Sequence, residues 1–275
     1  MFVYQIHIAS SEEPLWEERL TLAEPATQVF SRIDAQTISI EATFPNDLFP
    51  KILQAAFGGA LKPLIATGLT DGWEPLPAKI GSTFLVADPD TQPPDSDRTV
   101  LQMNTGEGVF VGHRHPTTLA CLRMMHHLHD EGRLTARFRC LDVGCGSGLL
   151  GIAAGFLGAG EINGFDFCET SIAAARVNAA HHEVTLASWQ CTEIEKFVTT
   201  QSYDLIVANL FSDLLVSSFA SLRNWLAPNG DLIVSGILQR FKETVFEAAQ
   251  LAGLTVVETR QRGPWIAGLL TSSDH

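Results

Sequence analysis

The sequence predicts an α/β protein whose larger part is built on a Rossmann-like sheet of seven strands. From Arg139 onward, short apolar runs alternate with helix-like segments. This alternation is typical of crossover units, in which parallel strands are covered on both faces by helices. The last two apolar runs are separated by Arg260–Pro264 alone, which is too short for a crossover. They are therefore expected to pair as an antiparallel hairpin beside five parallel strands.

The strands and helices of this sheet follow one another in a regular order. The expected strands are the runs RCLDVG, EINGFD, VTLASW, YDLIVANL, DLIVSGI, LTVVET and WIAGLLT. The expected helical segments are Gly148–Leu157, Glu169–Ala180, a short piece at Glu193–Phe197, Ser212–Leu226 and Gln239–Ala252. Because each crossover returns the chain to the same side, the ends of the parallel strands should gather at one carboxyl edge, where open sheets bind ligands.

A smaller α/β domain is expected at residues 1–58. Residues 2–8 and 37–44 alternate between apolar and polar side chains, as half-buried strands do, and helix-like stretches lie between and after them. Gly58 and Gly59 mark a break in this pattern. We therefore predict a separate N-terminal unit that ends near this break.

A connector at residues 59–104 leads into the larger domain at residues 105–275. It contains two expected strands, Thr83–Ala87 and Thr99–Met103. The segment between them, DPDTQPPDSD, is rich in proline and aspartate, and we interpret it as a solvated hairpin connection.

Composition excludes several classes of protein. Apolar residues make up 45% of the 275 residues, which is enough for a packed core and excludes global disorder. The net charge of −13 argues against direct binding of nucleic acid, whereas an acidic surface either suits a basic partner or serves solubility alone. No apolar run is long enough to cross a membrane, and the first residues lack the features of a secretory signal. We expect a cytoplasmic protein with no membrane partner.

Neither the cysteines nor the histidines indicate a metal site. The five cysteines are an odd number without a C-x-x-C pair, so we expect reduced thiols. The clustered histidines give no H-E-x-x-H motif, and we interpret them as solvated side chains on a helix face. These histidines are His113, His115, His126, His127 and His129.

The most informative motif is LDVGCGSG at residues 141–148, where the first parallel strand turns into a helix. Its three glycines lack Cβ atoms, so a ligand can approach the backbone closely. The next strand ends in Asp166, 22 residues beyond Gly144, where a carboxylate can accept hydrogen bonds from both ribose hydroxyls. The alternative is a tight turn without a ligand, and the acid at this position argues against it.

The spacing of the glycines distinguishes between two nucleotide-like ligands. A dinucleotide fingerprint is G-x-G-x-x-G, but here the pattern is G-x-G-x-G and Leu149 stands at the third glycine position. This version fits a nucleoside with an amino-acid tail and no phosphates, which is S-adenosylmethionine. The expected cofactor contacts in these two strand ends are Asp142, Gly144, Cys145, Gly146, Gly148, Asp166 and Phe167.

A polar amide follows the fourth parallel strand, in the run VANL. Asn209 lies at the carboxyl edge and can orient an incoming amine or hold the cofactor. It can also cap the helix that begins near Ser212, a purely structural role. We favour the functional role and assign Asn209 as the catalytic residue and as a cofactor contact.

A second cluster, GVFVGHRHPTT at residues 108–118, precedes the sheet. Pro116 and the threonines after it are typical of a helix start, with His115 at or near the N-cap. Such a helix would bring Thr118 close to the methionine end of the cofactor. We assign Phe110 and His115 to a substrate or gate loop.

Together these motifs resemble the PrmA family, the bacterial methyltransferases that modify ribosomal protein L11. The shared motifs are HPTT at 115–118, LDVGCGSG at 141–148, GFD at 164–166, VANL at 207–210 and SGIL at 235–238. The resemblance covers roughly residues 70–270. It implies a class I S-adenosylmethionine-dependent methyltransferase sheet, with cofactor contacts at Thr118, Gly144, Asp166 and Asn209.

The resemblance also implies a function. The family joins a small domain that recognises the ribosomal protein to a catalytic domain, and it methylates lysine side chains and an α-amine. We therefore hypothesise N-methyl transfer to a basic protein, here ribosomal protein L11. A different protein or small-molecule amine acceptor, and a non-catalytic cofactor-binding homologue, are the alternatives.

The sequence departs from the family in the loop before HPTT. Where the family usually has F-G-T-G-T, this chain has Phe110-Val111-Gly112-His113-Arg114. The replacement of two glycines by Val111 and His113 must change the backbone there, and this is the observation that motivates the alternative acceptors.

Overall fold

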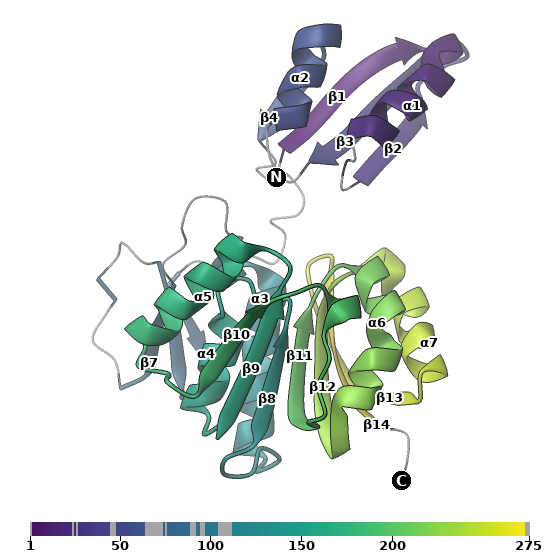
Figure 1. Ribbon diagram of the computed structural model, residues 1–275. Helices are drawn as coiled ribbons and strands as arrows, with labels where there is room; N and C mark the ends of the chain where they lie inside the picture. The colour runs from purple at the N-terminus through teal and green to yellow at the C-terminus, as the bar shows by residue number, and fades with distance from the viewer. Residues whose placement is uncertain are drawn as a thin grey trace. The chain divides into compact units, whose positions relative to one another are not determined.

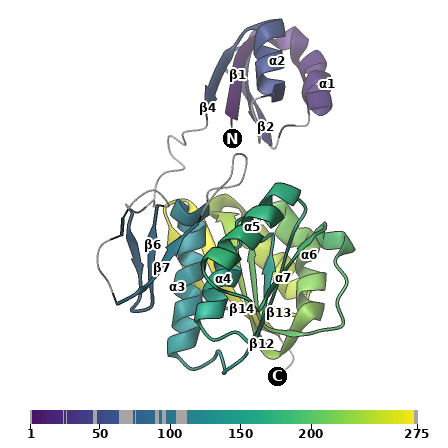
Figure 2. The same ribbon diagram turned by 60° about the vertical axis from the view of Figure 1, so that its left-hand side comes forward.

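The computed structural model divides into two compact units, residues 1–68 and 69–275, which we describe separately (Figures 1 and 2). It describes residues 2–23, 25, 27–44, 48–63, 74, 76–88, 92–93, 97–103 and 112–272. Among the helices within these ranges, none combines the length and the apolar character needed to cross a membrane.

The first unit is a four-stranded antiparallel sheet with two helices, in the chain order β-α-β-β-α-β. Its elements are β1 (Phe2–Ala9), a short 3-10 turn (Ser10–Glu12), α1 (Glu13–Ala23), β2 (Thr27–Arg32), β3 (Thr37–Phe44), α2 (Leu48–Phe57) and β4 (Ala60–Pro63). The strand order β2-β3-β1-β4 is that of ferredoxin-like folds. Tyr4 and Ile40 from the sheet and Trp16 from α1 belong to its buried core.

Two strands of this unit were not expected. β2 and β4 complete the sheet on its two sides, and β4 pairs with β1 beyond the expected boundary at residue 58. β4 has only four residues, and β2 shows little alternation between apolar and polar side chains. The local sequence pattern therefore did not reveal them. The unit therefore holds twice the number of strands that alternation alone predicted.

The expected hairpin in the connector is wrong. β5 (Ala78–Ile80), β6 (Phe84–Ala87) and β7 (Thr99–Gln102) form a three-stranded sheet, but β6 and β7 run parallel, so the segment between them is a crossover. Phe84 and Leu101 share a buried core with Met125 of α3 (Pro116–Asp130). This small sheet thus belongs to the second unit and packs against its first long helix.

The second unit is built on the predicted seven-stranded sheet. Its strands are β8 (Arg139–Val143), β9 (Glu161–Asp166), β10 (Ala187–Cys191), β11 (Tyr203–Asn209), β12 (Leu226–Leu238), β13 (Leu254–Arg262) and β14 (Trp265–Ser272). The spatial order is β10-β9-β8-β11-β12-β14-β13, and the first five strands pair in parallel. β14 pairs antiparallel with both β12 and β13, as the short link between the last two runs predicted.

Helices cover both faces of this sheet (Figure 1). α3, α4 (Leu149–Phe156) and α5 (Glu169–His181) lie on one face, and α6 (Ser212–Trp225) and α7 (Lys242–Leu251) on the other. Alternate residues of β11 feed the two cores: Val207 packs with the first set of helices and Ile206 with the second. Short 3-10 turns complete the unit at Gly112–Arg114, Ile194–Lys196 and Gln239–Phe241.

A bulge in β12 shapes the carboxyl edge. The register between β12 and β14 shifts between Val234 and Ile237, and Gly236 has a φ of +87°. A Cβ atom at Gly236 would overlap the carbonyl oxygen of Leu210. The ends of β11 and β12 can approach this closely because position 236 has no side chain.

We expect Gly236→Ala to destabilise the protein by about 3 kcal/mol or more, because it combines a left-handed backbone with a steric overlap against main chain. Gly132→Ala is the matched control: Gly132 has a φ of +70°, and a Cβ there meets nothing within 4 Å. This control should lose about 1–2 kcal/mol. Urea unfolding of both variants measures the difference, and equal losses would contradict the close approach.

Candidate active site

The glycine loop joins β8 to α4 at the carboxyl edge of the sheet. Gly144, Gly146 and Gly148 have φ values of +67°, +52° and +81°, which L-residues with side chains rarely adopt. Within the loop, the N–H of Gly148 donates to the carbonyl of Cys145 (2.8 Å), and the N–H of Cys145 donates to the carbonyl of Phe165 (3.0 Å). The loop is therefore a fixed, hydrogen-bonded turn.

Two buried side chains that sequence reasoning missed support this loop from below. The indole of Trp189, from β10, packs so closely that a Cβ at Gly148 would approach it to 3.1 Å and one at Gly151 to 2.8 Å. The amide of Asn178, from α5, is fully buried and donates to the carbonyl of Ser147 (2.9 Å). A polar residue among the apolar positions on the inner side of α5 is the signal that could have identified Asn178.

Asp142 lies beneath the loop and is 1% exposed. Its carboxylate accepts a hydrogen bond from the N–H of Gly151 in α4 (2.8 Å). Burial raises the pKa of Asp142 to about 7; the Gly151 bond opposes this shift, and the charge of Asp166 adds to it. Asp142 and the 7%-exposed Cys145 thus shape the loop from within.

Asp166 ends β9 on the other side of the loop. One carboxylate oxygen accepts the N–H of Gly146 (3.0 Å) and the other accepts the N–H of Cys168 (2.9 Å). Each oxygen keeps a further lone pair for a ligand hydroxyl. The side chain of the next residue along the chain, Phe167, is 77% exposed.

Asn209 and Thr118 meet at the same edge although they are far apart in the chain. The side-chain amide nitrogen of Asn209, at the end of β11, donates to the hydroxyl of Thr118 in the first turn of α3 (3.2 Å). The N-cap of α6 is Phe211, and its side chain makes no capping bond, so Asn209 does not cap that helix. The bond uses the amide nitrogen, and the carbonyl oxygen Oδ1 is the remaining acceptor of Asn209.

His115 is the N-cap of α3, as the sequence predicted. Its Nδ1 accepts the N–H of Thr117 (3.3 Å), and its ring packs edge-on against Trp265 with centroids 4.8 Å apart. Burial lowers the pKa of His115 to about 4, so the imidazole is neutral at pH 7. Trp265, at the start of β14, is a further residue that the sequence did not single out.

The structure corrects the interpretation of His113, His115 and His126 as solvated side chains. His115 packs against Trp265, and the His126 side chain is 12% exposed, with its Nε2 3.1 Å from the carboxylate of Asp130. His113 is 2% exposed, and its Nε2 lies 3.1 Å from the carboxylate of Asp88, directly after β6. Arg114 lies 3.8 Å from the same carboxylate. His127 and His129 are about 40% exposed and do lie on the outside of α3. Phe110 and Val111 fall outside the described residues.

Comparison with known proteins identifies the family. A sequence model described as ribosomal protein L11 methyltransferase (PrmA) matches residues 66–272. The chain belongs to this family. The match spans both the small three-stranded sheet and the seven-stranded sheet, so it includes every residue of the site described above.

Individual members of the PrmA family show how far the similarity extends. The ribosomal protein L11 methyltransferase of Cupriavidus metallidurans is 32% identical over 244 residues, 84% of this chain and 77% of that protein. The same-named protein of Desulforapulum autotrophicum is 33% identical over 176 residues, 63% of this chain and 56% of that protein. This chain therefore matches little more than half the length of some of its relatives.

A solved structure confirms the predicted class I methyltransferase fold. The crystal structure of a ribosomal protein L11 methylase from Lactobacillus delbrueckii subsp. bulgaricus has a TM-score of 0.61 and 26% sequence identity. The superposition covers 70% of this chain and 97% of that chain.

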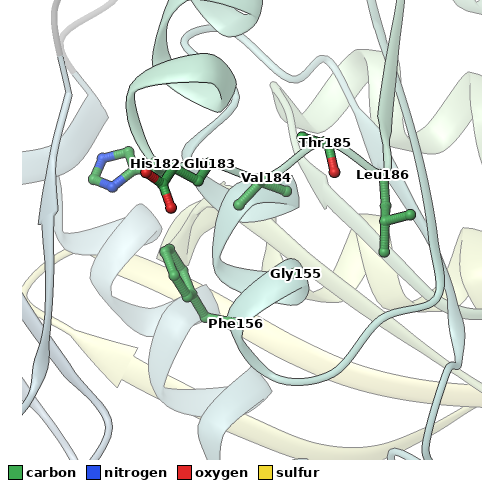
Figure 3. Close-up of a pocket in the computed structure, with 7 residues that line it drawn as sticks. All are labelled: Gly155, Phe156, His182, Glu183, Val184, Thr185 and Leu186. Carbon is green, nitrogen blue, oxygen red and sulfur yellow. The ribbon is translucent and has the colours of Figure 1, made fainter.

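A pocket elsewhere on the second unit is separate from this site. It is lined by Gly155 and Phe156 at the end of α4 and by the turn His182–Leu186 between α5 and β10 (Figure 3). Because β10 begins at Ala187, this pocket lies at the amino edge of the sheet. The pocket is therefore on the side of the sheet opposite the glycine loop.

We expect Asp142→Asn to change how stability depends on pH. The folded-state pKa of about 7 is raised above the ordinary value of 3.8, so the stabilising contribution is full at low pH and lost as pH rises toward 7. The variant keeps an acceptor for Gly151 and has no carboxyl to titrate. Relative to the variant, the wild type should lose a few kcal/mol between about pH 4 and about pH 8.

Urea unfolding across this range makes the measurement. Asp204→Asn is the control, because Asp204 also accepts a backbone N–H, from Arg139, on the neighbouring strand β11 (2.8 Å). If wild type and Asp142→Asn show parallel stability curves, the buried carboxyl does not titrate as described.

Proposed function

We propose that this chain transfers methyl groups from S-adenosylmethionine to amines of ribosomal protein L11. The observation that carries the proposal is the meeting of two parts at one sheet edge: the glycine loop with Asp166, and the Asn209–Thr118 pair. The first part suits a nucleoside with an amino-acid tail, and the second suits an uncharged amine. The names of the relatives support ribosomal protein L11 as the acceptor.

The residues present fit this cofactor. A Cβ at Gly146 would meet nothing within 4 Å, so the space above the loop is open to a ligand. Asp166 would accept the ribose hydroxyls, the exposed face of Phe167 would stack on the adenine, and Thr118 would lie toward the methionine end. Gly144, Gly146 and Gly148 would contact it through the backbone, with Asp142 and Cys145 holding the loop in shape.

The chain's own residues would act mainly by alignment. When bound, S-adenosylmethionine supplies a methyl group already activated by a sulfonium, so the acceptor needs the correct geometry. A lysine amine has an ordinary pKa near 10.4 and must lose a proton before it attacks. Asn209 would orient the neutral amine through Oδ1. His115, with a pKa of about 4, adds no positive charge beside it and is a weak base, so the proton passes to solvent.

The first unit, expected at residues 1–58, would recognise the basic protein substrate, and the protein would work in the cytoplasm without direct contact to nucleic acid.

The inward-facing His113 and its contact with Asp88 favour, as a second candidate, a different amine acceptor, because they reshape the segment before His115.

Incubation with S-adenosylmethionine and recombinant ribosomal protein L11 from the same organism tests the proposal. Intact mass spectrometry should show mass gains in steps of one methyl group. Calorimetry of cofactor binding serves as the control. Cofactor binding without any mass gain would rule out this acceptor, and a screen of cell extract with labelled cofactor would then identify the second candidate.

Two substitutions should separate cofactor binding from methyl transfer. We expect Asp166→Ala to weaken cofactor affinity about a hundredfold, since two hydrogen bonds to a charged group are lost. Asn209→Ala should lower kcat by about a hundredfold through lost orientation, with a much smaller loss of cofactor affinity from its expected cofactor contact. Thr118→Val tests the hydrogen bond that positions the amide. Calorimetry and steady-state kinetics give both quantities, and a loss of cofactor affinity alone in Asn209→Ala would refute its role toward the acceptor.

A further inference from the structure

The five cysteines fall into two groups. Cys121, Cys140 and Cys145 are buried, and burial raises the pKa of each thiol. Cys191 is exposed and Cys168 is partly exposed, and both lie at the carboxyl edge. Buried thiols are inert, whereas accessible thiolates react with oxidants and disulfides.

The two accessible cysteines lie at the carboxyl ends of neighbouring strands, Cys168 two residues after β9 and Cys191 at the end of β10. Cys191 is the last residue of β10 and stands opposite Asp166 in the parallel pairing with β9. Its Sγ donates to the carbonyl oxygen of Phe167 (3.4 Å). With standard bond lengths, this sulfur lies at most about 6 Å from the backbone nitrogen of Cys168.

Cys168 is directly coupled to the carboxylate assigned to the ribose. It is the N-cap residue of α5, and its N–H donates to Oδ1 of Asp166 (2.9 Å). This bond folds the chain back toward the end of β9 and keeps Cys168 near Cys191. Phe167 lies between the two in the chain, with its side chain 77% exposed.

The surroundings of Cys168 favour the reactive form of its thiol. Its Sγ lies 2.9 Å from the hydroxyl of Thr170. Hydrogen bonds from Thr170 and from the N–H of Ser171 lower the pKa of Cys168 below its ordinary value. A larger share of this thiol is therefore ionised near neutral pH, and the thiolate is the attacking species in disulfide exchange.

We propose that Cys168 and Cys191 are an oxidation site, and that the disulfide between them weakens binding of the adenosine part of the cofactor. The effect on the cofactor rests on the proposed function, whereas formation of the disulfide does not. The pair joins the ends of β9 and β10, which flank the nucleoside half of the site.

The chemistry balances with a small disulfide, such as oxidised glutathione, as the oxidant. The Cys168 thiolate attacks one sulfur of glutathione disulfide, forms a mixed disulfide and releases one glutathione thiolate. The Cys191 thiolate then attacks the Cys168 sulfur and releases the second glutathione. Two protein thiols are oxidised, one disulfide is reduced to two thiols, and the two protons pass to the departing glutathiones.

Formation of this disulfide alters the site because it moves Cys168, which is hydrogen-bonded to Asp166 and adjoins Phe167. A disulfide holds its two Cα atoms about 4.4–6.8 Å apart with a defined torsion. To meet this geometry, Cys168 must turn its side chain from Thr170 toward β10. That movement acts on the Cys168–Asp166 bond and on Phe167, the carboxylate and the aromatic face assigned to the cofactor.

The test uses the full chain, reduced or treated with oxidised glutathione. Peptide mapping by mass spectrometry should find a cross-link between the peptides that contain Cys168 and Cys191, while Cys121, Cys140 and Cys145 stay reduced. Calorimetry should show about tenfold weaker binding of S-adenosylmethionine, restored by dithiothreitol. Cys168→Ser and Cys191→Ser should each bind cofactor as the reduced wild type does and should form no cross-link.

Several outcomes would overturn the proposal. Glutathione retained on Cys168 in the wild type, with no cross-link, would show that the pair cannot close. Cross-linked protein with unchanged cofactor affinity would show that closure does not reach the site. Reduced protein that fails to bind S-adenosylmethionine would refute the proposed function and the effect on the cofactor, and the cross-link map, which needs no cofactor, would still report on the disulfide itself.

Discussion

The site depends on a constraint beneath the glycine loop. A loop of three left-handed glycines has many conformations in isolation, and here it has one because buried groups below it fix it through hydrogen bonds and close packing. Asp142 holds the N–H of Gly151, Asn178 holds the carbonyl of Ser147, and the indole of Trp189 fills the space that side chains would need. The ligand-facing side of the loop is thus set by contacts on its buried side.

Much of the larger unit follows from local pattern. Short apolar runs that alternate with helices specify crossover units, and a five-residue link specifies a hairpin, so β8 to β14 could be placed from the sequence. The small sheets could not be placed in this way. β4 is short and β6 pairs parallel with β7 across a short connection, and such pairings are decided by contacts distant in sequence.

The candidate site likewise contains residues that the sequence predicts and residues that it does not. The glycine loop, Asp166, Asn209 and Thr118 are visible because polar or glycine residues stand directly after buried strands or at a helix start. Trp189 and Trp265 carry no such signal, since an aromatic residue at a strand position is ordinary core. His113 was misread because its partner, Asp88, lies 25 residues away, directly after a strand of a separate small sheet.

The contact between His115 and Trp265 joins the start of the first long helix of the second unit to the start of β14, its last strand. β14 occupies an interior place in the sheet, between β12 and β13. During synthesis, Trp265 therefore leaves the ribosome after nearly all of the sheet has been made. A nascent chain can thus form the glycine loop long before the contact between His115 and Trp265 is possible.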